Sequence, residues 1–442
     1  MLIKPKEIDQ KEITGFTKDI DIFQRKPLGD TLANLLESTD ENIIIGIDSQ
    51  WGEGKSMFAK MFSAHLKNTR ETLSIYFDAF ENDYQKDPFL AIASEVVDLI
   101  NTHSPELKTE FKSSAIRASK AIARGALRIG IKTLTAGVLD GSIIDELGTA
   151  DDIGSEISQG LDQILIERLD EAKADKNSLE NFRSTLESHI SKIGNGRPVV
   201  FIIDELDRCR PDFSLELIEQ IKHLFTVKNL KFILITNKKQ TQAIIKKRYG
   251  AEIDAHLYLQ KFIDLWISLP RIETEYQSNT STYLKYLINK IATPEEKISN
   301  DTTIETLKEI FIANKTSFRG IQKTLSYFAI LHNSSPTTKY YEYYQVMMAI
   351  GCYSKAEKPE LMHAIYLKES EEKIKSLLFP TPPIGSREYR RLFTTLIVKY
   401  LISPPDIQNE MIRNQEIQTD FGRAIADDCM EKINNTLSLI SQ

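Results

Sequence analysis

The amino-acid sequence predicts an α/β fold: a parallel sheet with helices on both faces, a helical insert, and a C-terminal all-helical domain. Two observations support this prediction. Five short apolar runs alternate with helix-like stretches in the first part of the chain, and such runs become rare past Pro270. Strands that alternate with helices form parallel sheets covered on both faces, because each helix returns the chain to the same edge.

Each apolar run is too short for a helix and is typical of a strand that is buried on both faces. The first run, at 43–47, reads Ile-Ile-Ile-Gly-Ile, and the run at 199–203 is the most apolar. The predicted strands occupy residues 43–47, 73–77, 199–203, 232–235 and 265–269.

The chain is predicted to form two domains. We expect the sheet domain over residues 1–275 and the helical domain over residues 276–442, where prolines at 380, 382 and 383 interrupt the helical period. A helical stretch over about 88–192 separates the second and third strands and is far longer than that connection requires. It is therefore predicted to be an insert in the sheet domain.

Composition limits the classes of function. The 442 residues include 56 Lys and Arg against 63 Asp and Glu, a formal charge of -7. This balance argues against a surface that binds nucleic acid through overall basicity, although a local basic patch can still occur. The hydrophobic share of 41% and charged share of 27% are those of an ordinary folded protein.

The cysteines and the apolar runs indicate a cytoplasmic location. The three cysteines lie far apart, which is not the spacing of a disulfide framework or a zinc site, so we expect reduced thiols. No apolar run approaches the roughly 20 residues of a membrane-spanning helix. The cysteines are Cys209, Cys352 and Cys429.

One segment of the insert, residues 114–135, is predicted to be a basic amphipathic helix. Its basic residues follow one another at steps of three or four and would form one stripe along the helix. The stripe is either a solvated face or a surface for anionic lipid, nucleic acid or an acidic partner, and the sequence leaves both open. Its members are Arg117, Lys120, Arg124, Arg128 and Lys132.

A candidate phosphate-binding loop follows the first strand and precedes a predicted helix. Gly52 and Gly54 permit a tight turn whose amides can face phosphate oxygens, Lys55 would reach the β- and γ-phosphates, and Ser56 would ligate Mg²⁺. The first glycine of the usual pattern is replaced by Ser49, so a loop with no nucleotide is the alternative. The expected binding residues are Ser49, Gln50, Trp51, Gly52, Glu53, Gly54, Lys55, Ser56 and Met57.

Polar residues follow the third and fourth strands. Asp204 and Glu205 end the most apolar run, and Asn237 comes directly after the fourth. At the carboxyl edge of a parallel sheet, Asp204 can hold Mg²⁺ while Glu205 orients and deprotonates a water. Asn237 could bind the γ-phosphate or that water. The alternatives are two acids in an exposed loop and an asparagine that forms a turn.

These motifs resemble the KAP P-loop NTPases, and the resemblance covers about residues 20–275 well. Upstream, Asp21, Phe23 and Arg25 look like the family segment that packs near the nucleotide base, and downstream, residues 317–319 look like its lid segment. The motifs that carry the resemblance lie at 51–56, 77–81, 203–211, 219–225 and 258–264.

The resemblance implies an ATPase that uses ATP and Mg²⁺, with Arg319 approaching the γ-phosphate unless it is an ordinary surface arginine. Many family members carry membrane spans between the two nucleotide motifs. This chain has an insert there without spans, so any membrane association is expected to be peripheral. The family includes bacterial phage-exclusion proteins, which implies a possible role in antiviral defence.

Three hypotheses follow. The first is an ATPase that switches the helical domain, acting with a protein partner or as a homo-oligomer. The second is a nucleotide-gated scaffold with negligible turnover, and the third is a protein that engages DNA or anionic lipid through the basic helix. For the first, Lys261, Arg248 or Arg271 could supply a further transition-state cation.

Overall fold

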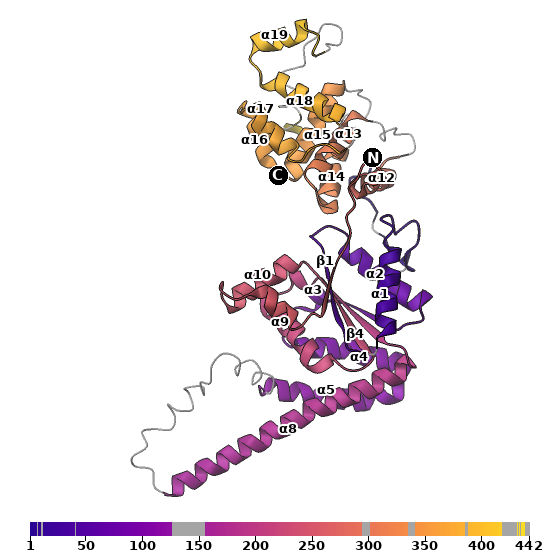
Figure 1. The fold of residues 1–442 in the computed structure, drawn as a ribbon, viewed down its shortest axis with the longest axis vertical. Coiled ribbons are helices and arrows are strands. Elements are labelled where there is room, and N and C mark those ends of the chain that lie inside the picture. The colour runs from indigo at the N-terminus through magenta and orange to yellow at the C-terminus, as the bar shows by residue number, and fades with distance from the viewer. Residues whose placement is uncertain are drawn as a thin grey trace. The chain divides into compact units, whose positions relative to one another are not determined.

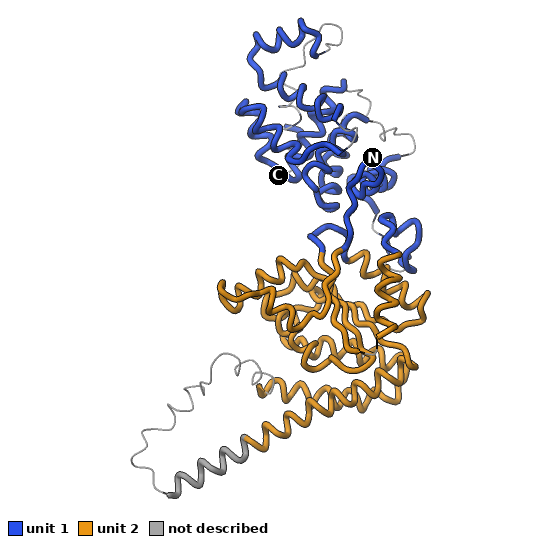
Figure 2. The backbone as a smooth tube through the Cα atoms, in the orientation of Figure 1, with its two compact units in different colours: residues 1–26, 49–55, 269–442 blue, residues 27–48, 56–268 orange. Residues whose placement is uncertain are grey.

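The computed structural model describes most of the chain and divides it into two compact units (Figure 2). Unit 1 comprises residues 1–26, 49–55 and 269–442, and unit 2 comprises residues 27–48 and 56–268. The described residues are 1–6, 8–9, 12–39, 41–125, 155–293, 301–334, 341–384, 388–417, 431, 433 and 435–437, with side chains from 169 onward in the helix that begins at 155.

Unit 2 contains a five-stranded sheet in the order β2-β3-β4-β1-β5, in which every pair of neighbours is parallel (Figure 1). All five predicted strands are confirmed. Two of the three interior strands, β3 and β4, are buried at every residue, as their apolar sequences predict. The strands are β1 (Ile44–Asp48), β2 (Ser74–Asp78), β3 (Val199–Asp204), β4 (Leu230–Thr236) and β5 (Leu265–Ser268).

Helices pack against this sheet around one hydrophobic core, in which the rings of Phe89 and Phe182 lie 4.9 Å apart at a steep angle. The predicted insert contributes α4, α5 and α8. The helices are α1 (Lys26–Ser38), α2 (Lys55–Thr69), α3 (Ala79–Asn82), α4 (Pro88–His103), α5 (Lys108–Ala123), α8 (Ser155–Gly194), α9 (Pro211–Gln220), α10 (Lys238–Tyr249) and α11 (Ala255–Gln260).

The prediction of one continuous basic helix over 114–135 is wrong, because the helix ends near the middle of this range. Helix α5 ends at Ala123, and Gly125 turns the chain with a φ of +98°. Helices α5 and α8 run side by side (Figure 1), and Arg124 forms an ion pair with the buried carboxylate of Asp175 on α8. Arg124, one member of the predicted stripe, therefore connects two helices of the insert through an ion pair. Arg128 and Lys132 lie outside the described residues.

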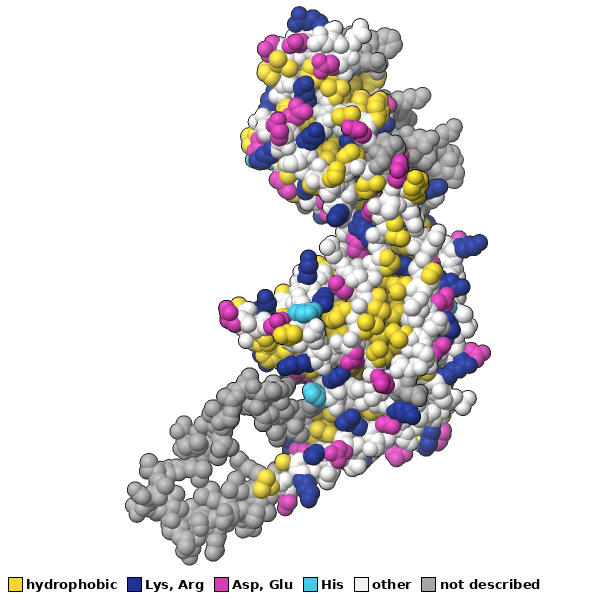
Figure 3. Space-filling view, in the orientation of Figure 1, with side chains coloured by type: hydrophobic (Ala, Val, Ile, Leu, Met, Phe, Trp, Pro, Cys, Tyr) yellow, Lys and Arg dark blue, Asp and Glu magenta, His cyan; other side chains and the backbone are white. Residues whose placement is uncertain are grey.

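Basic and acidic side chains are interspersed on the face of the molecule shown in Figure 3. Such mixing agrees with the small net negative charge of the sequence. Among the described residues, none of the helices combines the length and apolarity needed to cross a membrane. The thiols of Cys209 and Cys352 are free and buried, and Cys429 lies outside the described part of the chain.

Unit 1 contains the predicted helical C-terminal region, whose described residues form no strand past Leu269. Phe311, Phe328 and Met347 lie at the centre of its core. The predicted interruption by prolines is confirmed between α17 and α18. The helices are α12 (Asn279–Ile291), α13 (Thr302–Ala313), α14 (Phe318–Ser334), α15 (Glu342–Ala356), α16 (Pro359–Tyr366), α17 (Glu371–Leu378), α18 (Glu388–Ile402) and α19 (Pro405–Arg413).

Candidate functional site

The carboxyl edge of the unit 2 sheet gathers polar side chains. Asp48 ends β1, Asp78 ends β2, Asp204 ends β3 and Asn237 follows β4. Asp78 and Asp204 are register partners on neighbouring strands. Since ligands of open α/β sheets bind at this edge, the predicted residues stand in a position suited to binding.

Asp204 is fully buried, and both of its carboxylate oxygens accept hydrogen bonds. One carboxylate oxygen accepts a hydrogen bond of 2.9 Å from the Tyr76 hydroxyl, and the other accepts one of 2.8 Å from the backbone amide of Glu205. Burial raises the pKa of Asp204, and hydrogen bonds from Ser56 and Tyr76 oppose that rise. The sequence alone did not single out Tyr76, whose only signal was its place on the edge strand beside β3.

Glu205 turns its carboxylate toward the start of α2. Its backbone adopts the left-handed conformation with a φ of +58°, which costs about 1–3 kcal/mol in a residue with a Cβ. Oε1 accepts a hydrogen bond of 3.3 Å from the Ser56 hydroxyl, and Oε2 lies 2.6 Å from Nη1 of Arg208. Burial raises the pKa of Glu205, and the Arg208 guanidinium lowers it.

The alternative of two acids in an exposed loop is therefore wrong for both residues, because Asp204 is buried and the Glu205 side chain is 15% exposed. Arg208 lies one turn after the acidic pair. Its role as the ion-pair partner of Glu205 was not predicted, although a cation three residues after a carboxylate is a common pairing.

The candidate phosphate loop belongs to unit 1, and its backbone has the conformation that its glycines permit. Gly52 and Gly54 have φ values of +79° and +78°. The ammonium group of Lys55 lies inside the turn, where it donates to the carbonyl oxygens of Ser49 at 2.6 Å and Gln50 at 3.2 Å. The two left-handed glycines bend the chain tightly, and Lys55 lies against the carbonyl oxygens of this turn.

The other predicted loop residues differ in exposure. Glu53 is buried, Trp51 is 45% exposed, and Met57 is half-buried in the first turn of α2.

Gly52 also lies against the start of α14 within unit 1. A Cβ atom at Gly52 would lie 2.9 Å from Cβ of Arg319 and 3.2 Å from the hydroxyl of Ser317, so no larger residue fits without a shift. Arg319 is exposed, and within the described chain its guanidinium makes no hydrogen bond or ion pair. The predicted lid segment is therefore next to the phosphate loop, with an arginine beside it.

Asn237 acts as the N-cap of α10. Its Oδ1 accepts hydrogen bonds from the backbone amides of Lys239 at 3.1 Å and Gln240 at 3.3 Å. The side-chain oxygen of Asn237 therefore has the local structural role that the alternative gave to this residue. The side-chain nitrogen Nδ2 is a separate hydrogen-bond donor.

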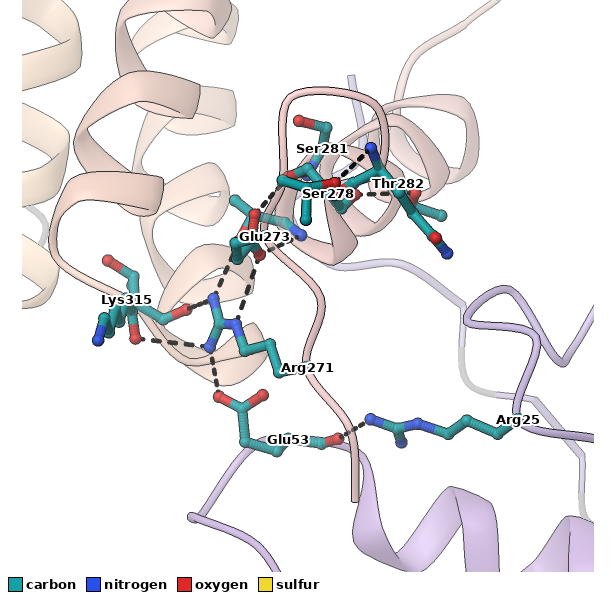
Figure 4. A network of polar contacts seen from close by, with 12 residues as sticks. Arg25, Glu53, Arg271, Glu273, Ser278, Ser281, Thr282 and Lys315 are labelled. Carbon is teal, nitrogen blue, oxygen red and sulfur yellow. Dashed lines mark hydrogen bonds and ion pairs between the residues drawn. The ribbon is translucent and has the colours of Figure 1, made fainter. Parts of the chain in front are cut away.

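Two of the suggested transition-state cations are paired instead. Arg248 contacts Asp212 at 3.3 Å, and Arg271 donates a hydrogen bond of 2.5 Å to the carboxylate of Glu53. In the same network Arg25 donates to the carbonyl oxygen of Glu53 at 3.1 Å (Figure 4). Burial lowers the pKa of Arg25 to about 10, although Glu53 opposes the shift.

Among the described residues, no group of three or more His, Cys, Asp and Glu side chains is arranged to hold a metal ion by itself. A phosphate-bound magnesium ion differs from such a group, because it takes few protein ligands and completes its shell with phosphate oxygens and water.

A known protein family matches most of this chain. The family model described as "KAP family P-loop domain" matches residues 25–335. No curated protein matches the chain.

The solved structures that match this chain include two that are covered over almost their full length. The ORC2 protein of Aeropyrum pernix, in ADPNP–ADP complexes, is 11% identical with a TM-score of 0.38 and 94% of each chain covered. CDC6P from Pyrobaculum aerophilum is 10% identical with a TM-score of 0.38 and 98% of each chain covered. With identities and TM-scores this low, neither structure supports a conclusion about this chain.

Proposed function

Because the chain belongs to the KAP family of P-loop NTPases, we propose that it binds ATP with Mg²⁺ and hydrolyses the nucleotide. One observation carries the proposal: the hydroxyl of Ser56 lies 3.3 Å from Glu205, which follows Asp204 directly. A helix start and a distant strand end thus bring together a hydroxyl and two carboxyl groups. Hydrolysis of a magnesium nucleotide requires these groups in one place.

The residues suit a magnesium nucleotide by their chemistry. Ser56 and Asp204 offer hydroxyl and carboxylate oxygens, which are the ligands that Mg²⁺ prefers. Asp204 is fully buried, so its carboxylate would gain a counter-charge from a bound cation. When bound, Mg²⁺ would neutralise charge on the phosphate oxygens.

The loop at 49–55 would bind the phosphates through its amides. The left-handed conformations of Gly52 and Gly54 support this role, since they bend the chain around a small anion. Lys55 would exchange its hydrogen bonds to the loop carbonyls for contacts with the β- and γ-phosphates. The proposed binding residues are Ser49, Gln50, Trp51, Gly52, Glu53, Gly54, Lys55, Ser56 and Met57.

Glu205 would act as the general base. It would leave its hydrogen bond with Ser56, orient a water in line with the γ-phosphate, and accept the proton as the oxygen attacks phosphorus. Nδ2 of Asn237 would donate to that water or to the γ-phosphate. Arg319, which lies beside Gly52, would contribute positive charge as negative charge builds up on the phosphate oxygens.

We further propose that residues 1–275 form the NTPase domain and residues 276–442 a helical domain that the nucleotide switches. The output would be a change in a protein partner or in assembly of the chain with itself. A cytoplasmic location and a role in bacterial defence against phage belong to this proposal through the sequence and the family resemblance alone.

Steady-state phosphate release tests the proposal. Glu205→Gln should lower the rate about 100-fold or more and leave ATP binding intact, since a general base contributes about 10²–10⁴. Lys55→Ala should abolish binding itself. Lys67→Ala, at the exposed end of α2, is the matched control and should behave as wild type. Wild-type rates from either Glu205→Gln or Lys55→Ala would refute the assignment.

The same preparations separate an enzyme from a nucleotide-gated scaffold. Single-turnover hydrolysis is measured beside the ATP-dependent change in molecular mass. Association with ATP in the absence of turnover would favour the scaffold, whereas turnover that Glu205→Gln removes would favour the ATPase.

A further inference from the structure

Glu53 is a carboxylate in a loop that is proposed to bind anions, and it is only 6% exposed. A negative charge at this position opposes phosphate binding unless another group neutralises it. Burial raises the pKa of Glu53, and the guanidinium of Arg271 lowers it. The charge and position of Arg271 therefore bear directly on what the loop can bind.

Arg271 joins Glu53 to two further segments of unit 1 (Figure 4). Nη1 donates to Glu53 at 2.5 Å, and Nη2 donates to the hydroxyl of Thr280 at 2.9 Å and to the carbonyl oxygen of Thr316 at 2.8 Å. Glu273 lies 3.5 Å from Nε. The planar guanidinium thus uses its fork to connect the phosphate loop with the start of α12 and with the residue before the lid segment.

The side chain of Arg25 forms hydrogen bonds with the main chain of the same loop. Its Nη2 donates to the carbonyl of Glu53 at 3.1 Å, and Nη1 donates to that of Gly54 at 3.4 Å. The two arginines share an aromatic support, because Arg25 lies over the ring of Phe23, Arg271 lies over the ring of Phe318, and these two rings stack 4.5 Å apart. Glu53 is thereby held at both its backbone and its side chain.

The lid segment begins immediately after Thr316. Ser317 and Arg319 are the residues that a Cβ at Gly52 would meet. Glu53 reaches the residue before them through Arg271, which donates to Glu53 and to the carbonyl oxygen of Thr316. A continuous series of hydrogen bonds thus runs from Glu53 through Arg271 to Thr316, which precedes the segment that carries Arg319.

We propose that Glu53 and Arg271 are a positioning pair that couples the conformation of the phosphate loop to the placement of Arg319. The inference rests on the proposed function, since it concerns the same phosphate site. Arg271 has two tasks: it neutralises Glu53, and its fork fixes the segment that carries Arg319. A lysine can perform the first task but not the second.

The first task predicts a specific pattern in ATP affinity. Arg271→Met leaves a buried, unpaired carboxylate in the loop and should weaken binding of a fluorescent ATP analogue about tenfold or more. Glu53→Gln should weaken it less than about threefold, because an uncharged side chain does not repel phosphate. The double variant should bind within about threefold of Glu53→Gln, since removing the carboxylate removes the reason for the loss.

The second task predicts that a variant can lose turnover and still bind ATP with normal affinity. Arg271→Lys should keep the affinity near that of wild type while kcat for phosphate release falls as it does in Arg319→Ala. Combined with Arg319→Ala, Arg271→Lys should cause no further loss of kcat, because both changes remove the same contribution. Arg413→Met, at an exposed arginine at the end of α19, is the matched control and should change neither quantity.

The decisive experiment is the double-mutant cycle between Glu53 and Arg271 in analogue binding, with melting temperatures recorded for each variant. Recovery of affinity in the double variant supports the pair. If Arg271→Met does not fold, a double variant that folds and binds supports it equally. Losses that multiply would overturn the inference but leave the proposed function intact, whereas a wild-type chain that binds no nucleotide would overturn both.

Discussion

The hydroxyl of Ser56 donates a hydrogen bond of 3.3 Å to the carboxylate of Glu205, across a separation of 149 residues in the chain. Ser56 comes directly after the loop lysine, and Glu205 comes directly after the most buried strand of the sheet. The contact thus connects two motifs that the sequence places far apart. Parallel strands make it possible, because β1 and β3 end at the same edge.

Gly52 provides a prediction about loop shape. Gly52→Ala should abolish ATP binding, because its left-handed backbone disfavours a Cβ and that Cβ would press on Arg319. Gly196→Ala is a matched control with a φ of +82° and no atom within 4 Å of the added Cβ. It should cost about 1–2 kcal/mol in the free energy of unfolding and leave binding unchanged. Equal affinity for ATP in the two variants would contradict the account.

Arg319 provides a prediction about turnover. Arg319→Ala should lower kcat for phosphate release about 100-fold with little change in ATP affinity, because the charge is needed most in the transition state. Affinity and single-turnover rate are measured on the same preparation. A loss confined to affinity would show that Arg319 contributes to ground-state binding instead.

The alkaline stability of the chain gives a third prediction. Burial raises the pKa of Tyr353 to about 12 from an ordinary value of 10.0. Between these pH values the unfolded chain loses the phenol proton while the folded chain keeps it, so the free energy of unfolding falls as pH rises. The fall attributable to Tyr353 should be about 2–3 kcal/mol.

Tyr353→Phe should reduce this fall when urea unfolding is followed at pH 9, 10, 11 and about 12. Tyr276→Phe serves as the control, because that ring is 96% exposed and should leave the unfolding curves as they are. A pH dependence that Tyr353→Phe does not alter would show that the buried phenol is not its source.

The insert gives a prediction that separates packing from partner binding. Arg124→Glu should lower the stability of the chain, because it places a second negative charge next to the buried carboxylate of Asp175. Arg117→Glu changes an exposed arginine that, within the described part of the chain, donates a hydrogen bond to the Ser113 hydroxyl, and should have little effect. The two variants are compared by denaturant unfolding. Equal stability would show that the Arg124 ion pair contributes nothing to the insert.

Much of this fold could be predicted because its signals are local. The strands are short apolar runs, and the glycines of the loop and the acidic pair after β3 lie next to the elements that position them. The family match over residues 25–335 agrees with these motifs. The positions of Asp204 and Glu205 at the end of β3 follow from the same signals, whereas the position of Arg319 near the loop was expected from the family resemblance. The roles of all three residues in catalysis stay predictions.

Other features depend on the folded chain and could not be predicted. The pairing of Arg271 with Glu53 joins residues 218 positions apart, and neither residue type indicates its partner. The end of α5 at Ala123 was missed because the helical period of the sequence continues through Gly125. Asn237 illustrates a third limit, since one side chain can cap a helix with its oxygen and still offer an amide donor.

The central claim is that Ser56 and the acidic edge of the sheet hold the metal of a bound nucleotide. The most direct measurement is a titration of the wild-type chain and of Ser56→Ala with ATP, each with and without Mg²⁺. We predict that the wild-type chain binds ATP much more tightly with Mg²⁺ and that Ser56→Ala loses this dependence. Equal binding by both proteins, or binding that is indifferent to Mg²⁺ in the wild type, would contradict the claim.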